Sequence, residues 1–412
     1  MARPRWTPIS LPQMIGLRDI EEARARVASV IRTTHVDRSD SLSRLVGRPV
    51  LLKGEHLQRT GSYKIRGAYN FISRLPDSVQ EVVAASAGNH AQGVALAATL
   101  TGKRSTIFMP VNAPLPKVEA TRSYGAEVRF EGEAVDDCLA VASEYADSTG
   151  AILVPPFDDP LVIAGQGTVG LEIAEQAADA EVVVVPVGGG GLISGVATAL
   201  AHTRRSVRVI GVEAAGAAAM RASLDAGHLA SIDELHTMAD GIAVKTPSEL
   251  TLAHVRAYVD DIVTVTEEQI SQALILLLER AKAVVEPAGA VGLAAILAGK
   301  VPGTGPALAL LSGGNVDPLL MIKLIDHGLS AAGRYLVLRI VLDDRPGSLA
   351  RLTSAVAKMG LNVLEVEHHR AGTHVGVHEV EVLLTLETRD PDHRDEVVGE
   401  LRQYGFGVEL LS

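Results

Sequence analysis

The chain has 412 residues, of which 47 % are apolar and only 3 % aromatic. This length predicts two or three domains, whose cores are packed by Ala, Val, Leu and Gly. The 38 basic and 49 acidic residues give a net charge of -11, which disfavours nucleic acid or an anionic membrane as a partner. No apolar run approaches the roughly 18 residues that a membrane-spanning helix needs, so we expect a soluble, cytoplasmic protein.

The single cysteine, Cys138, excludes an internal disulfide and fits a reducing compartment. No nearby motif supplies a base, so we expect Cys138 to be a small apolar side chain in a helix rather than a nucleophile. Residues 1–10 are basic and contain proline, but they lack the apolar stretch of a signal peptide.

Strands and helices alternate along most of the chain, which predicts an α/β fold with parallel sheets. The first elements are a helix over residues 19–31, a strand over 50–53 and a helix over 63–74. Four short apolar strands then predict a compact parallel subdomain, at residues 82–85, 105–109, 126–130 and 151–154. A helix over 166–178 precedes four further strands, at residues 181–186, 207–212, 261–265 and 307–311. Runs of valine such as 182–185 are typical of strands buried on both faces.

The pattern changes after residues 331–333, where a small split-βαβ domain of β-α-β-β-α-β order is predicted. Its elements are a strand over 335–342, a helix over 348–358, strands over 362–369 and 377–386, a helix over 391–404 and a last strand over 407–411.

Residues 55–68, E-H-L-Q-R-T-G-S-Y-K-I-R-G-A, place Lys64 where a strand gives way to a helix. Gly61 supplies a flexible turn and Ser62 is the expected helix N-cap, so Lys64 lies in the first helical turn. The positive end of the helix dipole there favours the neutral amine, which can attack an aldehyde.

A second segment, residues 86–93, follows the strand at 82–85 and reads S-A-G-N-H-A-Q-G. Its turn of small residues exposes backbone N–H groups at a helix start, where a substrate carboxylate can bind. The substrate-binding candidates are Ser86, Ala87, Gly88, Asn89 and His90. His90 is either a general base or a capping or packing residue, because such a histidine often serves the helix end.

The third segment is a glycine run after the strand at 181–186, consisting of Gly188, Gly189, Gly190 and Gly191 and followed by Leu192. Four glycines are entropically costly, and the close approach of backbone N–H groups to a phosphate explains them. A dinucleotide turn is the alternative, because Glu213 lies near the distance at which an acidic residue would bind a ribose. The fourth segment, Ser312-Gly313-Gly314-Asn315, follows the last strand of this region.

Together these segments resemble the threonine dehydratase branch of the fold-type II pyridoxal 5'-phosphate (PLP) enzymes. The resemblance implies a body over residues 1–330, in which a small domain of about residues 83–157 is inserted into a larger one. It also implies that Lys64 carries PLP as a Schiff base, that Tyr63 packs on one face of the cofactor and that Asn89 hydrogen-bonds its phenolic oxygen. The glycine run would hold the phosphate, and the neutral hydroxyl of Ser312 would face the pyridine nitrogen, which favours β-elimination.

The implied reaction is dehydration and deamination of L-threonine to 2-oxobutanoate and ammonia, with Lys64 removing the α-proton. L-Serine would give pyruvate by the same route. L-Serine or threo-3-hydroxyaspartate dehydratase is the alternative within the class. A catalytically silent amino-acid or PLP sensor is the alternative from another class.

Three positions refine this hypothesis. Related serine racemases carry a second serine where this chain has Ala87, so racemisation is not expected. Those relatives also bind a divalent cation between two carboxylates, of which Glu213 matches one while Ala219 replaces the other, so no metal is predicted. Glu286 is either an active-site carboxylate or an acid at a helix N-terminus before Pro287.

Residues 334–412 resemble an ACT domain, through the D-R-P-G-S-L turn and M-G-L-N-V after the helix. The resemblance implies an amino-acid effector, isoleucine or valine, and a homodimer or homotetramer. The regulatory candidates are Arg345, Gly347 and Asn362. The alternative is a domain that only holds subunits together, and both isoleucine biosynthesis and a degradative role stay open.

Overall fold

The computed structural model describes residues 14–204, 206–331, 333–370 and 376–411. The chain divides into two compact units, Met1–Pro318 and Leu319–Ser412. The N-terminal segment of residues 1–10, for which no signal peptide is predicted, lies outside the described residues. Within the described part of the chain, no helix is both long and apolar enough to cross a bilayer.

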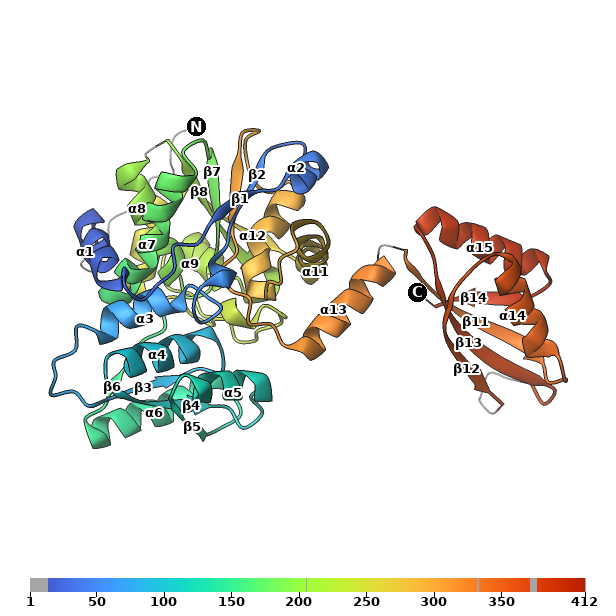
Figure 1. The fold of residues 1–412 in the computed structure, drawn as a ribbon, viewed down its shortest axis with the longest axis horizontal. Coiled ribbons are helices and arrows are strands. Elements are labelled where there is room, and N and C mark those ends of the chain that lie inside the picture. Colours follow the sequence, from blue (N-terminus) through green and yellow to red (C-terminus); the bar gives the residue numbers. More distant parts are fainter. Residues whose placement is uncertain (1–13, 205, 332, 371–375, 412) are drawn as a thin grey trace. The chain divides into compact units, whose positions relative to one another are not determined.

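A six-stranded sheet of order β1-β2-β10-β7-β8-β9 forms the centre of the first unit (Figure 1). All its neighbouring strands run parallel except the edge pair β1 and β2. The strands are β1 (Val36–Arg38), β2 (Val50–Lys53), β7 (Val182–Pro186), β8 (Arg208–Ala214), β9 (Asp261–Val265) and β10 (Ala307–Leu310). Every residue of β7 is buried, which confirms that its valine run belongs to a strand covered on both faces.

Helices cover both faces of this sheet. Val183 and Val185 point to the face where α7, α8 and α10 pack. Val184 points to the opposite face, where Gly292 lets α12 approach the carbonyl oxygen of Val184. The helices of this part are α1 (Leu17–Val27), α2 (Asp40–Val46), α7 (Pro160–Gln176), α8 (Gly191–Thr203), α9 (Ala219–Ala226), α10 (Glu249–Tyr258), α11 (Glu267–Leu276) and α12 (Pro287–Leu297). The sequence interpretation missed β1 and α2, because both are short.

A second sheet, of order β5-β4-β3-β6, is parallel throughout, as predicted. Its strands are β3 (Glu81–Ala85), β4 (Arg104–Met109), β5 (Glu127–Phe130) and β6 (Ile152–Leu153). The accompanying helices are α3 (Lys64–Ile72), α4 (Asn89–Leu100), α5 (Leu115–Ser123) and α6 (Val135–Thr149). Val82 and Ala84 pack with residues of α3 and α4, whereas Val83 packs with Cys138 of α6, because successive strand residues face opposite sides. The predicted boundaries, residues 1–330, 83–157 and 334–412, stay predictions.

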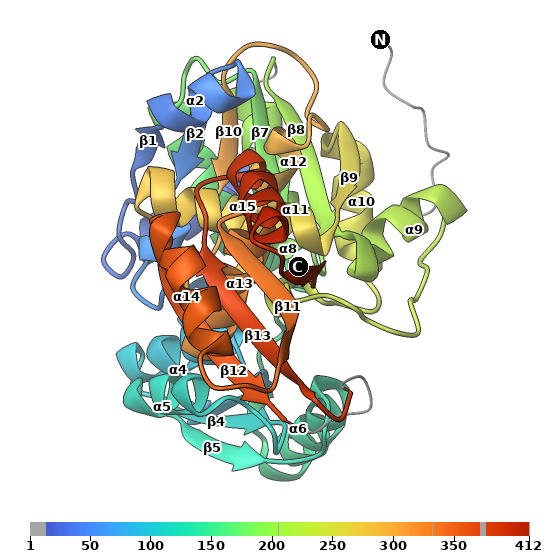
Figure 2. The same cartoon turned by 90° about the vertical axis from the view of Figure 1, so that its right-hand side faces the viewer.

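The second unit contains α13 (Pro318–Ala331) and an antiparallel sheet of order β12-β13-β11-β14. The remaining elements are β11 (Tyr335–Asp343), α14 (Ser348–Lys358), β12 (Val363–His369), β13 (Glu379–Glu387), α15 (Pro391–Gln403) and β14 (Gly407–Leu410). Leu338 and Ile340 of β11 are buried in one cluster with Leu352 of α14 and Leu401 of α15, and Figures 1 and 2 show both helices on one side of the sheet. This arrangement confirms the predicted β-α-β-β-α-β order.

Candidate active site

The candidate site lies at the carboxyl ends of parallel strands. β2, β10 and β7 are neighbours in the large sheet, and the segments carrying Lys64, Ser312 and the glycine run follow these strands in turn. In open parallel sheets, ligands bind at the carboxyl ends of the strands. The chain after β3 contributes the segment with Asn89, so four segments far apart in the sequence supply the site.

Lys64 is the first residue of α3, in agreement with the predicted helix start. Its Nζ donates a hydrogen bond of 2.9 Å to the carbonyl oxygen of Pro156 and lies 5.3 Å from the centre of the Tyr63 ring. Burial lowers the pKa of Lys64 to about 8, and the nearby carboxylate of Glu286 opposes this shift. A minor fraction of the amine, larger than that of an ordinary lysine, is therefore neutral near physiological pH, and this neutral form is the nucleophile or base.

The prediction that Ser62 caps α3 is wrong. Tyr63 occupies the N-cap position, and no side chain caps this helix. Ser62 instead forms an isolated β-bridge with Gly313, and its buried hydroxyl has no hydrogen-bond partner among the residues that the structure describes. The bridge places the chain after β10 beside the lysine segment, where the N–H of Tyr63 donates to the carbonyl oxygen of Ser312. A buried hydroxyl without a partner beside Lys64 is a polar group available to a ligand.

A polar cluster joins two of the four segments to Glu286. Asn89, the first residue of α4, donates from Nδ2 to Oε1 of Glu286 at 2.6 Å, and its Oδ1 accepts from Nδ2 of Asn315 at 2.7 Å. Glu286 occupies the N-cap position of α12, yet its carboxylate does not cap that helix. Burial raises the pKa of Glu286 to about 7, Asp240 adds to the shift, and the bond from Asn89 opposes it. The carboxylate of Glu286 thus faces the site. Sequence reasoning missed the role of Asn315, whose amide holds Asn89.

Because Gly313 has no side chain, the polar cluster can occupy the space beside it. A Cβ atom at Gly313 would lie 2.2 Å from Oε1 of Glu286 and 3.0 Å from Nδ2 of Asn89. Contacts this short force the carboxylate to move.

We therefore expect Gly313→Ala to lower kcat/KM by about tenfold or more, because the carboxylate that orients Asn89 is displaced. Steady-state kinetics with L-threonine would measure this loss. Gly399→Ala, in α15, is the matched control, because its added Cβ would meet no atom within 4 Å. Equal kinetics for the two variants would contradict the importance of the Asn89–Glu286 contact.

His90 is buried beside Asn89, and its Nε2 bonds to the carbonyl oxygen of Val154 at 2.9 Å. Burial lowers the pKa of His90 to about 3, and the charge of Lys64 adds to the shift. The ring is therefore neutral and held by the backbone, which favours the packing interpretation over general-base chemistry. The preceding backbone of Ser86, Ala87 and Gly88 leads directly into α4.

The glycine run forms the turn from β7 into α8. Gly190 has φ +92°, a conformation that favours glycine. A Cβ at Gly189 would lie 2.2 Å from Phe157, and one at Gly188 would lie 2.9 Å from Cα of Ile242. Close packing by neighbouring chain segments therefore requires these glycines. Phe157 follows Pro156, whose carbonyl oxygen accepts the hydrogen bond from Lys64. Residues 156–157 therefore contact both the lysine and the glycine turn.

Comparisons with known proteins identify the family. Residues 27–313 match the family described as pyridoxal-phosphate dependent enzyme, and residues 336–406 match the ACT domain. The chain belongs to the pyridoxal-phosphate dependent enzyme family. The fold class and the PLP cofactor predicted from the sequence are thereby confirmed.

Relatives of this PLP enzyme match it over nearly its whole length. It is 47 % identical over 402 residues to L-threonine ammonia-lyase of Thermotoga maritima, covering 97 % of this chain and 100 % of that protein. It is 46 % identical over 396 residues to L-threonine ammonia-lyase of Geobacter sulfurreducens, covering 95 % and 98 % respectively. Among solved structures, maize serine racemase superposes with a TM-score of 0.73 at 36 % identity, covering 77 % of this chain and 99 % of that one.

The residues present fit PLP. The amine of Lys64, with its lowered pKa, suits an aldehyde carbon, and the unpartnered hydroxyl of Ser62 is a further polar group beside it. Gly191 begins α8, a helix of 13 residues whose first N–H groups have no partner within the helix, and Leu192 follows it. These N–H groups suit a phosphate. Ser312 is 3 % exposed, and its carbonyl oxygen accepts from the backbone N–H of Tyr63 at 3.2 Å.

The buried carboxylate of Glu213 is bound by the backbone at the start of α9. Its two carboxylate oxygens accept the backbone N–H groups of Met220 and Arg221, both at 2.8 Å, at the start of α9. Ala219 is the first residue of that helix. Among the described residues, no group of three His, Cys, Asp or Glu side chains is arranged to hold a metal ion.

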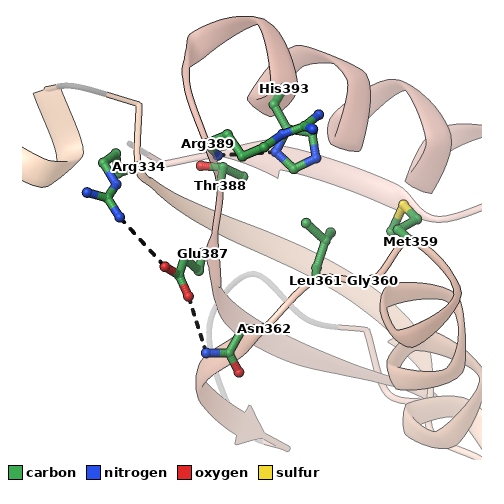
Figure 3. Close-up of a pocket in the computed structure, with 9 residues that line it drawn as sticks. All are labelled: Arg334, Met359, Gly360, Leu361, Asn362, Glu387, Thr388, Arg389 and His393. Atoms are coloured by element: carbon green, nitrogen blue, oxygen red, sulfur yellow. Dashed lines mark hydrogen bonds and ion pairs between the residues drawn. The ribbon is translucent and has the colours of Figure 1, made fainter.

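The structure separates the three regulatory candidates. Arg345 and Gly347 line a hollow of about 280 Å³ at the turn between β11 and α14, which we call the turn hollow. Asn362 lines a different hollow of about 600 Å³, which we call the strand-end hollow and which Figure 3 shows. Arg334, Glu387 and Arg389 are among the other residues of the strand-end hollow.

A buried ionic network, which sequence reasoning missed, supports the lysine helix. Arg66 contacts Glu55 through two hydrogen bonds of 2.8 Å and Glu172 through one of 2.7 Å. Lys53 donates to Glu172 at 2.6 Å, and Thr34 donates to Glu55 at 2.6 Å. Burial is the largest influence on the pKa of Glu55 and would raise it, but the charge and hydrogen bonds of Arg66, together with Thr34 and Lys53, outweigh burial and the pKa is lowered. The sequence feature that could have revealed this network is a charged residue within an otherwise apolar segment, such as Glu172.

The lowered pKa of Lys64 predicts the pH dependence of its reaction with PLP. In cofactor-free protein, the rate at which PLP and borohydride trap Lys64 should rise with pH. The midpoint of this rise should lie near pH 8, instead of near 10.5 as for an ordinary lysine. Glu286→Gln should move this midpoint lower, because the carboxylate favours the charged amine. Mass spectrometry of the trapped peptide would measure the rate, and a midpoint near that of an ordinary lysine would contradict the prediction.

Proposed function

We propose that this PLP enzyme is a threonine ammonia-lyase, which converts L-threonine to 2-oxobutanoate and ammonia and also accepts L-serine. The observation that carries the proposal is the match to two proteins named L-threonine ammonia-lyase over 95 % and 97 % of the chain, ACT domain included. The lysine amine with its lowered pKa, the amide cluster and the glycine turn support β-elimination.

PLP, when bound, supplies an electron sink that makes the α-proton of an attached amino acid removable. Lys64 holds the cofactor and then takes the α-proton at Nζ, because burial keeps this amine partly neutral. Asn89 is oriented by Glu286 and Asn315 and would hydrogen-bond the cofactor's phenolic oxygen. Tyr63, at the N-cap of α3, would pack against the cofactor beside Lys64.

The N-terminal turn of α4 binds the substrate carboxylate through the backbone of residues 86–90. The glycine turn and Leu192 would hold the phosphate at the start of α8. Ser312 would offer the pyridine nitrogen a neutral group, which favours loss of the β-hydroxyl over transamination. Racemisation is disfavoured despite the structural similarity to serine racemase, because Ala87 offers no hydroxyl on the other face of the substrate.

The ACT domain makes the enzyme allosteric, with isoleucine or valine as the effector and the turn hollow with Arg345 and Gly347 as its site. We propose that the enzyme acts in isoleucine biosynthesis in the cytoplasm and assembles as a homodimer or homotetramer; a degradative role is the alternative. Coupling between effector and substrate is reciprocal, so an effector that weakens threonine binding is itself weakened by threonine.

Product analysis across L-threonine, L-serine and threo-3-hydroxyaspartate, with and without isoleucine, tests the proposal. We expect 2-oxobutanoate from threonine as the fastest reaction and a lower rate with isoleucine. Preference for serine or 3-hydroxyaspartate would establish a different dehydratase. Absence of any keto acid from holoenzyme would instead establish a sensor.

A further inference from the structure

An ion pair connects helix α5, beside the second sheet, to a turn next to Glu286. Lys117 of α5 donates a hydrogen bond from Nζ to a carboxylate oxygen of Asp240, and the Lys117 side chain is mostly buried. Asp240 begins a short 3-10 turn, Asp240–Ile242. A Cβ at Gly241, the next residue, would lie 3.5 Å from Oε1 of Glu286, so this turn lies beside that carboxylate. The ion pair is therefore one residue away from the polar cluster of the site.

Charged groups from three elements act on the buried carboxyl of Glu286. Burial is the largest cause that raises its pKa, to about 7, and the charge of Asp240 adds to this rise. The charges of Lys117 in α5 and Lys64 in α3 oppose it. The phenol of Tyr63, a further neighbour, stays neutral because burial raises its pKa. Glu286 is thus near its midpoint at neutral pH, where a change in one nearby charge alters its ionisation most.

The ionised form of Glu286 suits its hydrogen bond with Asn89. Oδ1 of Asn89 accepts from Asn315, so the Nδ2 group of the same amide needs an acceptor on its other side. Oε1 of Glu286 provides this acceptor at 2.6 Å. A carboxylate accepts such a bond more strongly than a protonated carboxyl, because its charge assists the bond. Protonation of Glu286 should therefore loosen the amide of Asn89.

We propose that Lys117 is a positioning residue for the threonine ammonia-lyase reaction, and this inference rests on that proposed function. Its ammonium group neutralises Asp240, which keeps Glu286 ionised as the acceptor for Asn89. A mechanical clamp between α5 and the turn would make both partners of the ion pair equally necessary. Charge compensation makes Lys117 necessary only while Asp240 is charged, so the two mechanisms predict different behaviour of the variants.

Infrared difference titration of the full-length holoenzyme, with Glu286→Gln as the reference, measures the proton on Glu286 directly. Lys117→Met should raise the midpoint by about half a pH unit or more relative to the wild type. Adding Asp240→Asn to this variant should return the midpoint to the wild-type value or below, because Asp240 acts on Glu286 more strongly than Lys117 does. Lys245→Met is the matched control, because it breaks an ion pair of 3.1 Å between the same loop and Asp136 of α6. It should leave the midpoint unchanged.

The pH profile of kcat/KM for L-threonine shows whether this ionisation matters to the reaction. Lys117→Met should lose about two- to fivefold near pH 7, because a rise in pKa of half a unit to one unit lowers the ionised fraction of Glu286 by that factor. The loss should disappear about two pH units higher, where the carboxyl is ionised in both proteins. Asp240→Asn alone, and Lys117→Met combined with Asp240→Asn, should stay close to the wild type at both pH values.

The inference is overturned if Lys117→Met leaves the midpoint of Glu286 at its wild-type value. It is also overturned if Asp240→Asn and the double variant lose as much activity as Lys117→Met at every pH, which is the result that a clamp predicts. Thermal unfolding and the absorbance of lysine-bound PLP check that each variant is folded and loaded, and Lys117→Gln replaces Lys117→Met if the latter does not fold. If the holoenzyme forms no keto acid, the proposed function fails, while the infrared titration still decides whether Lys117 controls Glu286.

Discussion

Lys64→Ala should abolish turnover with L-threonine, lowering kcat by roughly a thousandfold or more. The variant loses both the amine that holds PLP and the base that removes the α-proton, and neither His90 nor another described side chain at the site is placed to replace it. His90 is neutral and bonded to the backbone at Val154. Formation of 2-oxobutanoate measures the rate, and the visible absorbance of lysine-bound PLP gives an independent readout.

Tyr63→Phe is the matched control for this substitution, because it keeps the ring beside Lys64 and removes only the hydroxyl. We expect its lysine-bound absorbance to remain and its kcat to change far less. Appreciable dehydratase activity in folded Lys64→Ala protein would contradict the assignment of this residue.

Arg66→Met should destabilise the first unit by about 3–5 kcal/mol. The substitution keeps an unbranched apolar stem but removes the guanidinium, which leaves Glu55 without its two hydrogen bonds from Arg66 and Glu172 with Lys53 as its remaining cation. All four charged side chains of this network are nearly inaccessible to water, so solvent cannot replace the lost guanidinium. Urea-induced unfolding, followed by circular dichroism, would measure the change in the free energy of unfolding.

The pKa of Glu55 predicts how the loss of stability in Arg66→Met depends on pH. The pKa of Glu55 is lowered in the folded wild type, so its stabilising contribution is present above the unfolded value near 4.5 and is lost as the pH falls through the folded value. The difference between wild type and Arg66→Met should therefore shrink in acid. Arg74→Met, at an exposed position just after α3, is the control and should change stability by less than about 0.5 kcal/mol. A loss of similar size in both variants would contradict a role for the buried pairs.

The sequence predicted the fold because its periodic patterns are local. The valine run of β7, the strand-helix alternation and the split-βαβ order all follow from side chains that alternate or repeat along one segment. Lys64 could be found in the same way, since it stands at a strand-to-helix junction. The inserted position of the small domain came from the resemblance, because periodicity does not specify which sheet a strand joins.

The rest of the site depends on contacts between segments that are distant in the sequence. Asn315 holds Asn89 across 226 positions, and Arg66 reaches Glu172 across 106. Ser62 was expected to cap a helix because its local sequence suits a cap, but pairing with Gly313 determines its conformation instead. Asn362 was grouped with Arg345 by motif alone, whereas the turn after α14 places it in the other hollow.

The burial of Cys138 makes the protein convenient for site-specific fluorescent labelling. Its thiol is inaccessible to water beneath the small sheet and donates to the carbonyl oxygen of Glu131 at 3.0 Å, and burial raises its pKa to about 11. Such a thiol reacts slowly with maleimides at neutral pH. One cysteine introduced on the surface of each compact unit would therefore carry a donor and an acceptor dye without removal of the native residue. Energy transfer between the dyes would then follow the distance between the units as amino acids are added.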